Sequence, residues 1–471
     1  MALRSIILLL GVTLPVSNAQ DSKPVQPLSA SQLAERSIHR RAVEAVIWAM
    51  PAVNYELMLQ QALKAKGGVN QVVYWSKPVD WKNQTLTPNP DAIYFMIFFN
   101  TKEGPVVIDV PPAEGGSFAA NIDNIWQMPL EDAGPNGADK GKGGRYLILP
   151  PGYKGKTPEG FIVLQSDTFG GYALLRSNLA SHADADVAKS VEYGKRLKIY
   201  PLSKADKPAE TIFTDAKDEL FDSTIPYDLR FFQSLNRIIQ SEPWLIRDKA
   251  MIDSLKTIGI EKGKPFQPNT KTVEIMNAAA AEAHAILNEK LEVGFPPFYS
   301  DSIWGIPAFP EAVQETSSGY ASLDQYPVDA RALTYSIGYV GIKRLGTAQF
   351  YLMTGKDKEG QSLDGSRTYR LVVPANAPTK QYWSATLYDR DTHALIKNMN
   401  RASCSSNYST MQKNADGSVD LYFGPNSPPG KESNWVPTDK NGKFEVLFRL
   451  YGPDKSLAEK AWRLPNIEPM K

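Results

Sequence analysis

The sequence predicts an α+β protein in which two antiparallel, jelly-roll-like β-sandwich domains are joined by a helical section. Short apolar and aromatic runs bounded by turn residues occur in two blocks, at 69–202 and 346–471. Between them, residues 203–345 carry apolar side chains at helical spacing with irregular stretches. The 35 prolines and 33 glycines are what turn-rich β structure requires.

Residues 1–19 are expected to be a cleaved export signal. Arg4 gives a basic start, a short apolar core follows, and small residues end at Ala19 before Gln20. The apolar core is far shorter than the about 20 residues that a spanning helix needs. We therefore expect a periplasmic or secreted protein, with no transmembrane segment after signal removal. Residues 20–68 would hold a polar leader and N-terminal helices.

The net charge and the cysteine content argue against a nucleic-acid partner and exclude an intrachain disulfide. The formal net charge is +1 at pH 7, and loss of Arg4 with the signal brings it near zero, which argues against a nucleic-acid partner. Cys404 is the single cysteine, so no intrachain disulfide forms. A small buried side chain is the common role for such a cysteine, and a catalytic thiol served by His393 is the alternative.

The histidine pattern gives no support for a metal centre. The four histidines form neither an HExxH motif nor any close pair, so a zinc site is not expected. No EF-hand loop occurs, although oxygen-ligand calcium sites follow other patterns as well. We predict no metal site and no cofactor.

The N-terminal section predicts two helical pieces. Ser31 is placed to cap the first, Pro51 is expected to produce a kink or a break between them, and the pair Gly67 and Gly68 ends the second. The strands expected in the first β block lie at 92–99, 105–111, 118–126, 146–149, 161–166 and 172–176.

The middle section predicts helices and one long irregular segment. Helices are expected at 186–197, 227–240, 273–291 and 329–353. The aromatic, proline-rich stretch at 295–324 is either a functional cover or a packed irregular segment.

The last block predicts strands at 369–374, 382–389, 419–423 and 444–451, and a short helix at 457–462. In the strand at 444–451, side-chain alternation puts Glu445, Leu447 and Arg449 on one face.

Several motifs are similar to those of a known family pair. TPNPDAIY in the first β block, and DGSRTYRL, YWSATLYD and NWVP followed by FEVLFRLYGP in the second, resemble two tandem domains of unknown function found together in exported bacterial proteins. The resemblance covers nearly all of the mature chain. The family usually has Asn or Asp where this chain has Pro90. The resemblance implies two β-sandwich domains with helices between and around them, and it implies no reaction and no catalytic residue.

Candidate site residues are the polar and aromatic groups inside these motifs. A stiff turn at 87–91, with a proline on either side of Asn89, precedes a buried strand and presents oxygen atoms. Asp91 and Asp389 are the candidate catalytic carboxylates, with Glu445 as an alternative second group. The candidate ligand-binding residues are Asn89, Tyr94, Trp126, Arg176, Arg370, Trp383, Tyr388 and Arg449. Against this stands a structural role, with the aromatic rings in the core and Arg449 paired with Asp389.

Two functions from different classes fit these residues. One is a hydrolase or lyase that acts on a small polar or carbohydrate-like substrate by carboxylate acid–base chemistry. The other is a non-catalytic periplasmic ligand-binding protein, with a pocket between the two domains covered by residues 293–324. Both require a small-molecule ligand, and both leave homo-oligomerisation open.

Overall fold

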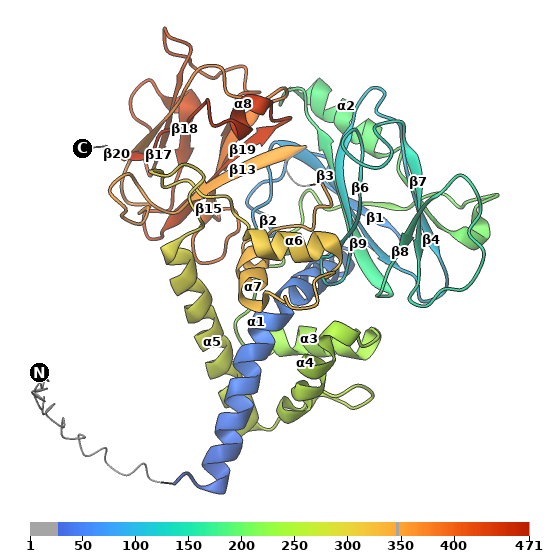
Figure 1. Ribbon diagram of the computed structural model, residues 1–471. Coiled ribbons are helices and arrows are strands. Elements are labelled where there is room, and N and C mark those ends of the chain that lie inside the picture. Colours follow the sequence, from blue (N-terminus) through green and yellow to red (C-terminus); the bar gives the residue numbers. More distant parts are fainter. Residues whose placement is uncertain (1–26, 345–347, 471) are drawn as a thin grey trace, which may run out of the picture.

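The computed structural model describes residues 27–344 and 348–470, so the predicted signal peptide lies outside the described residues. Two β domains lie side by side, and a group of helices extends away from them (Figure 1). The predicted α+β class with a helical middle section is confirmed. Within the described ranges, no helix combines the length and apolar character that crossing a membrane requires.

The first β domain has two sheets that share one hydrophobic core. The six-stranded sheet has the order β11-β1-β3-β9-β5-β6 and the four-stranded sheet the order β10-β4-β7-β8. Their strands are β1 (Val72–Tyr74), β3 (Ala92–Asn100), β4 (Val106–Val110), β5 (Phe118–Asn124), β6 (Pro129–Ala133), β7 (Gly144–Leu149), β8 (Ile162–Gln165), β9 (Gly170–Asn178), β10 (Lys198–Pro201) and β11 (Phe213–Asp215). Strand β11 comes from the section predicted as helical, and it pairs in parallel with β1.

Strand β3 is buried on both faces, which explains its continuous apolar sequence. Ile93, Phe95 and Ile97 point into the core between the two sheets. Tyr94 and Met96 point the other way, into a core that the sheet shares with the helices. One face of the six-stranded sheet is therefore available to other parts of the chain.

The second β domain is also built from two sheets around one core. Their strand orders are β13-β19-β15-β16 and β18-β17-β14-β20. The strands are β13 (Gln349–Thr354), β14 (Tyr369–Val373), β15 (Trp383–Asp389), β16 (Ser403–Ser405), β17 (Val419–Gly424), β18 (Trp435–Pro437), β19 (Phe444–Tyr451) and β20 (Glu468–Pro469). Most pairs in both domains are antiparallel, but β7–β8 and β17–β18 are parallel, so the jelly-roll pattern is not confirmed.

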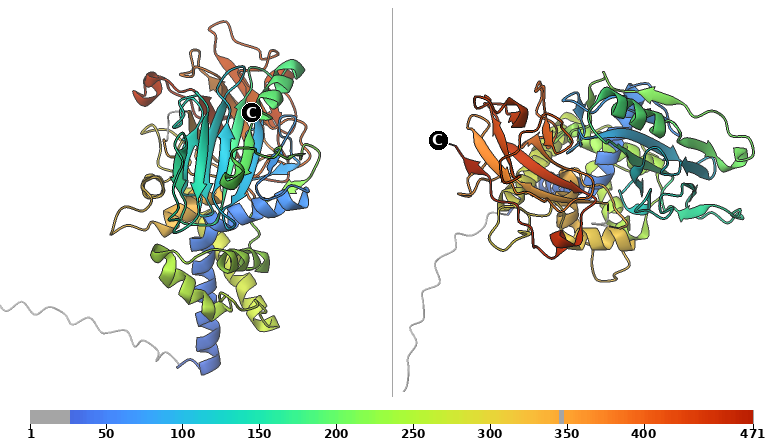
Figure 2. Two further views of the ribbon diagram at one scale, coloured as in Figure 1. Left: turned by 90° about the vertical axis from the view of Figure 1, so that its right-hand side faces the viewer. Right: turned by 90° about the horizontal axis from the view of Figure 1, so that it is seen from above.

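Helix α1 (Ala30–Lys64) runs through Pro51 without a break, so of the kink or break expected there only the kink is compatible with the structure. Figure 2 shows that the helix changes direction along its length, as a proline within a helix favours. Ser29, rather than Ser31, caps it, because the Ser29 hydroxyl accepts a hydrogen bond from the Gln32 backbone and the Gln32 side chain bonds back.

The region predicted as one helix at 329–353 is instead a helix followed by a strand. Helix α7 (Val328–Ser336) ends early, and β13 pairs with β19 from Gln349 to Thr354. Pairing with a distant strand outweighs the local helical pattern here.

The remaining helices are mostly short. They are α2 (Asp184–Gly194), α3 (Leu229–Ser241), α4 (Lys249–Ser254), α5 (Thr270–Val293), α6 (Pro310–Ser318) and α8 (Lys455–Ala458), with 3₁₀ turns at Leu202–Lys204, Ile246–Asp248, Leu255–Ile258 and Glu432–Asn434. Strands β2 (Asn83–Gln84) and β12 (Phe221–Asp222) form a small parallel sheet of their own. Helix α8 is shorter than the helix predicted at 457–462, and β20 follows it.

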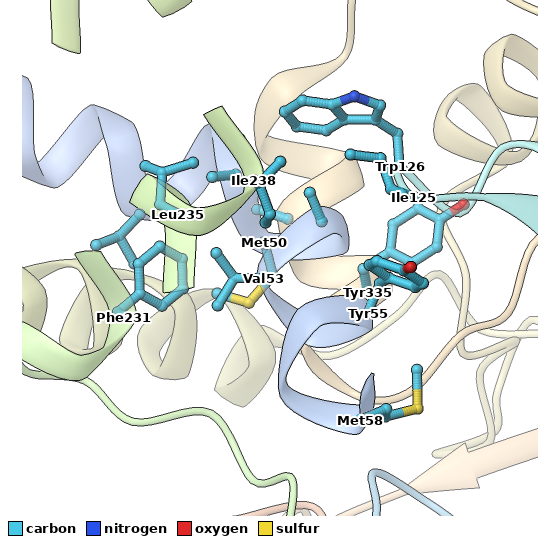
Figure 3. Close-up of a cluster of buried hydrophobic side chains, with 14 of the residues drawn as sticks. Met50, Val53, Tyr55, Met58, Ile125, Trp126, Phe231, Leu235, Ile238 and Tyr335 are labelled. Carbon is cyan, nitrogen blue, oxygen red and sulfur yellow. The ribbon is translucent and has the colours of Figure 1, made fainter. Parts of the chain in front are cut away.

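A central core joins the helices to both β domains. It includes Met50 and Val53 of α1 beside Leu235 and Ile238 of α3 (Figure 3). The same core includes side chains of β3 and β9 from the first domain and Leu447 of β19 from the second. The helical section therefore packs against both domains at once and fixes where they meet.

Truncation inside this central core should destabilise the protein. Ile238 is 2% exposed, so Ile238→Ala is expected to lower the free energy of unfolding by about 2–5 kcal/mol through lost burial and a cavity. Ile246 is 94% exposed, so Ile246→Ala should change it by less than about 0.5 kcal/mol. Urea denaturation followed by circular dichroism measures both, and equal effects would contradict the assignment of this core.

Candidate functional site

The turn at 87–91 lies at the contact between the two β domains. The Arg449 guanidinium of β19 donates to the Thr87 carbonyl oxygen at 2.9 Å. The Tyr388 hydroxyl of β15 donates to the Pro88 carbonyl oxygen at 2.7 Å. The turn is thus held by strands that lie about 300 residues further along the chain.

Asn89 is the centre of this contact. Its side-chain nitrogen donates to the hydroxyls of Tyr382 and Tyr451, both at 3.0 Å, and its side-chain oxygen accepts from the Asp91 backbone. Its own backbone nitrogen donates to the Tyr94 hydroxyl at 2.8 Å. Because Asn89 is 1% exposed, every one of these bonds is shielded from water.

Beside the turn is a pocket of about 270 Å³ that both domains and the connecting section line. The first domain supplies Thr87, Asn89, Tyr94 and Arg176. The second supplies Gln349, Phe350, Tyr351, Met353, Leu447 and Arg449. The connecting section supplies 306–308, 337–340 and Ile342, so part of the stretch predicted as a cover does line the pocket.

Two buried arginines give the pocket its charge. Arg449 is 2% exposed and donates to the Thr386 hydroxyl at 2.9 Å, while its Nε has no partner. Arg176 is 7% exposed and donates to the Asn121 side-chain oxygen at 3.1 Å. Within the described ranges, neither guanidinium forms an ion pair and no Asp or Glu lines the pocket. Guanidinium groups stay protonated at neutral pH, so the pocket carries two positive charges.

The nearby carboxyl of Asp123 does not balance these charges. Asp123 is fully buried and neither of its oxygens has a hydrogen-bond partner. Burial, together with the charge of Asp132, raises the pKa of Asp123 well above its usual range, and Arg176 opposes this only in part. Burial thus acts toward the neutral form of Asp123, and within the described residues this carboxyl forms no ion pair with Arg176.

The rest of the pocket wall is mainly apolar and closely fitted. Gly338 lies in this wall with a φ of 89°. A Cβ at this position would lie 2.6 Å from both the Leu86 carbonyl oxygen and the Thr87 hydroxyl, so only glycine fits. Gln349 adds a buried side-chain oxygen that has no partner. The pocket thus offers apolar surface, two cations and a few unpaired polar atoms.

Asp91 lies outside the pocket lining. Its Oδ1 is 2.9 Å from His182 Nε2 and accepts from the Ser403 hydroxyl at 3.3 Å, and its Oδ2 has no partner. The His182 ring packs edge-on against Tyr408, with centroids 4.5 Å apart. Asp91 and His182 of the first domain thereby contact two residues of the second.

The other two carboxylates lie in separate networks. Asp389 accepts hydrogen bonds from the backbone of Asp391 and Thr392, which forms a local turn. Glu445 is 2.7 Å from His393 Nδ1 and 3.3 Å from Arg390 Nη1. The structure does not bring Asp91 and Asp389 together in the pocket, and the ion pair between Arg449 and Asp389 does not form.

The remaining candidates have structural contacts. Trp126 packs against Trp48 in the central core, and Trp383 stacks on Phe448 inside the second domain. Arg370 pairs with Asp420 at 2.8 Å, away from the pocket. Tyr388 supports the Arg449 guanidinium with its hydroxyl. Of the ligand-binding candidates, Asn89, Tyr94, Arg176 and Arg449 share the pocket.

Several pocket residues were not among the candidates. Tyr351 and Met353 belong to β13, at the end of the region predicted as a helix, where the aromatic and apolar run in QFYLMT is also compatible with a strand. Residues 306–308 and 337–340 come from irregular chain, for which no periodic pattern exists.

Cys404 is buried and lies away from His393, which pairs with Glu445. Burial raises the pKa of the Cys404 thiol to about 12. In the described part of the chain, no cluster of three or more His, Cys, Asp or Glu side chains is arranged to hold a metal ion.

Native Cys404 should resist thiol reagents. At pH 8 the raised pKa keeps the sulfur protonated, and the thiolate is the reactive form. We expect no labelling by a chromogenic disulfide reagent in the folded protein, and one thiol per chain after unfolding in guanidinium. Rapid labelling of the folded protein would contradict the buried, protonated state.

Loss of the Asn89 side chain should weaken the contact between domains. Asn89→Ala removes three hydrogen bonds and leaves the Asp91 backbone N–H without its partner, so we expect a loss of about 1–3 kcal/mol in unfolding free energy. Asn441→Ala, at an exposed turn, is the matched control and should cost less than about 0.5 kcal/mol. Chemical denaturation measures both, and a neutral Asn89→Ala would refute this role.

Two solved structures are similar to this chain. The VPA0106 protein from Vibrio parahaemolyticus has a TM-score of 0.56 at 20% identity, over 92% of this chain and 100% of that one, which shows a shared fold. An uncharacterized protein from Burkholderia cenocepacia has a TM-score of 0.42 at 11% identity, over 93% of this chain and 95% of that one.

No curated protein matches the sequence. Two family models do, and both are described as proteins of unknown function: DUF1254 matches residues 69–201 and DUF1214 matches residues 348–455. The resemblance seen in the motifs is thereby confirmed, and the chain is a two-domain protein with a DUF1254 domain followed by a DUF1214 domain.

Proposed function

We propose that this protein binds a small organic anion with an apolar body in the pocket between its two domains. The observation that carries the proposal is the pair Arg176 and Arg449, which face one pocket that no described carboxylate lines. Pockets of a few hundred Å³ with apolar walls and few polar groups are typical small-molecule sites.

The physical argument rests on the cost of buried charge. A charge taken out of water is unfavourable unless it is paired, and the unpartnered Nε of Arg449 adds an unmade hydrogen bond. A carboxylate or similar anion would supply the missing pairing, since guanidinium binds such groups through two parallel hydrogen bonds. The apolar wall would favour a ligand whose remainder is hydrocarbon or aromatic.

Binding without catalysis is favoured over acid–base chemistry. A reaction of that kind needs titratable groups that converge on one substrate position. Asp91 and Asp389 are held in separate networks, and neither lines the pocket. With export through residues 1–19, the ligand would be met in the periplasm or outside the cell.

Ligand binding should be selective for charge. The mature protein is melted with alkyl and aromatic carboxylates and with the uncharged amide of each. A carboxylate present at 100 times its dissociation constant should add about 2.7 kcal/mol to folded-state stability, and its amide should add far less.

Arginine variants test which side chains bind the carboxylate. Arg449→Gln and Arg176→Gln should each remove the carboxylate effect, while Arg145→Gln, at an exposed position of the first domain, should leave it unchanged. Circular dichroism establishes that each variant is folded, and two arginines in separate domains guard against one variant failing to fold. Equal effects of acid and amide, or full binding in both pocket variants, would contradict the proposal.

A further inference from the structure

A second pocket of about 240 Å³ lies directly beside the first. The two pockets share two wall residues, Ile337 and Met353, which are 3% and 4% exposed. The second pocket is lined by four charged side chains, Glu292, Lys356, Arg390 and Glu445, and by the chain around 293–297. The apolar side chains of Ile337 and Met353 therefore separate it from the pocket that the two arginines line.

Strand β19 runs along both pockets. Alternate residues of a strand face the same side, and Glu445, Leu447 and Arg449 do so here. Glu445 lines the second pocket, whereas Leu447 and Arg449 line the first. From Glu445 to Arg449 the strand rises by about 13 Å at 3.3 Å per residue. The two pockets thus lie along one strand, with the apolar Leu447 between Glu445 and Arg449.

The partition between them has a fixed backbone and a flexible side chain. Met353 exchanges two backbone hydrogen bonds with Gly305, at 3.0 and 2.8 Å. The methionine side chain has three rotatable bonds and adapts its shape readily to a neighbour. A chain-like ligand could therefore pass Met353 without any change in the strand.

The second pocket has a mainly apolar lining and four charged side chains whose charges cancel. Glu445 is held by Arg390 and by His393, and Arg390 also pairs with Glu292 at 3.4 Å. Lys356 supplies a second cation against the two carboxylates. Hydrogen-bond donors and acceptors are both present, and the two positive charges balance the two negative ones. Such a surface suits an uncharged polar group, such as a hydroxyl or an amide, better than an ion.

We propose that the two pockets form one elongated binding site. Its ligand is an amphiphile with an anionic group at Arg176 and Arg449, a hydrocarbon middle at Met353 and Leu447, and an uncharged polar end at Arg390 and Glu445. This inference rests on the proposed function and extends it by naming the ligand's length and its second polar end.

Two series of probes test the length and the far end. Straight-chain monocarboxylates and their ω-hydroxy counterparts, from short to long, are titrated calorimetrically into the full mature protein. Each methylene buried should tighten binding about fourfold. In short members the ω-hydroxyl would lie against apolar side chains and weaken binding. In members long enough to span about 13 Å it should reach the second pocket and tighten binding about tenfold over the plain acid.

Two variants test where the uncharged polar end of the ligand binds. The readout is the ratio of affinities between ω-hydroxy and plain acid at the spanning length, measured within each variant. Arg390→Gln should reduce this ratio to about one, and Met353→Phe, which thickens the partition, should weaken both long acids relative to short ones. Met353 lies on β13 and Arg390 follows β15, so the test remains valid if one of the two variants fails to fold.

The outcomes separate this inference from the proposed function. If the ω-hydroxyl weakens binding at every length while short acids still bind through the two arginines, the elongated site is refuted and the anion site stands. If no carboxylate of either series binds, both are refuted. A ratio that rises from below one for short acids to above one at the spanning length, and that falls to about one in Arg390→Gln, supports the elongated site.

Discussion

The placement of the two β domains depends on one buried contact, in which the second domain's strands hold the turn at 87–91. Arg449 and Tyr388 bond the carbonyl oxygens of Thr87 and Pro88, and Asn89 reaches the two tyrosines behind them. The two prolines keep the turn stiff, so its carbonyls are presented in one orientation. The pocket lies where this contact leaves space between the strands, and its walls take their positions from it.

The central core works together with this contact. Helix α1 lies against the open face of the six-stranded sheet, and side chains of β19 enter the same core. The helical section is therefore neither a linker nor a separate domain. It packs against both β domains, which explains how residues 306–308 and 337–340 come to line a pocket whose charges belong to the sheets.

The sequence predicted those parts of the fold that have a strong local pattern. The run at 92–99 is buried on both faces and needs no alternation, and the shared face of Glu445, Leu447 and Arg449 follows from the period of a strand. Strand β13 was missed because its partner lies about 100 residues away, and pairing outweighed a helical pattern. At Pro51 the local pattern does not distinguish a kink from a break, and the helix stays continuous because the residues around Pro51 are buried in the central core.

The candidate site was predictable only in part, for a related reason. Tyr94 and Arg176 meet because the neighbouring strands β3 and β9 carry them, and such pairing can be inferred, whereas Asn89 and Arg449 join them only through the contact between the two domains. Whether a tryptophan faces a core or a pocket depends on what packs over its sheet, and Trp383 and Trp126 proved to be core. The lining at 306–308 and 337–340 comes from irregular chain, which has no periodic pattern to interpret.

The two arginines lie in different domains, so the pocket depends on both domains being encoded together. Arg176 belongs to the first domain and Arg449 to the second, so each domain alone presents one of the two charges and only part of the wall. A gene for either domain by itself would encode an incomplete cavity and an exposed sheet face that the other parts normally cover. Dividing the two domains between two genes would therefore divide the pocket as well as the chain.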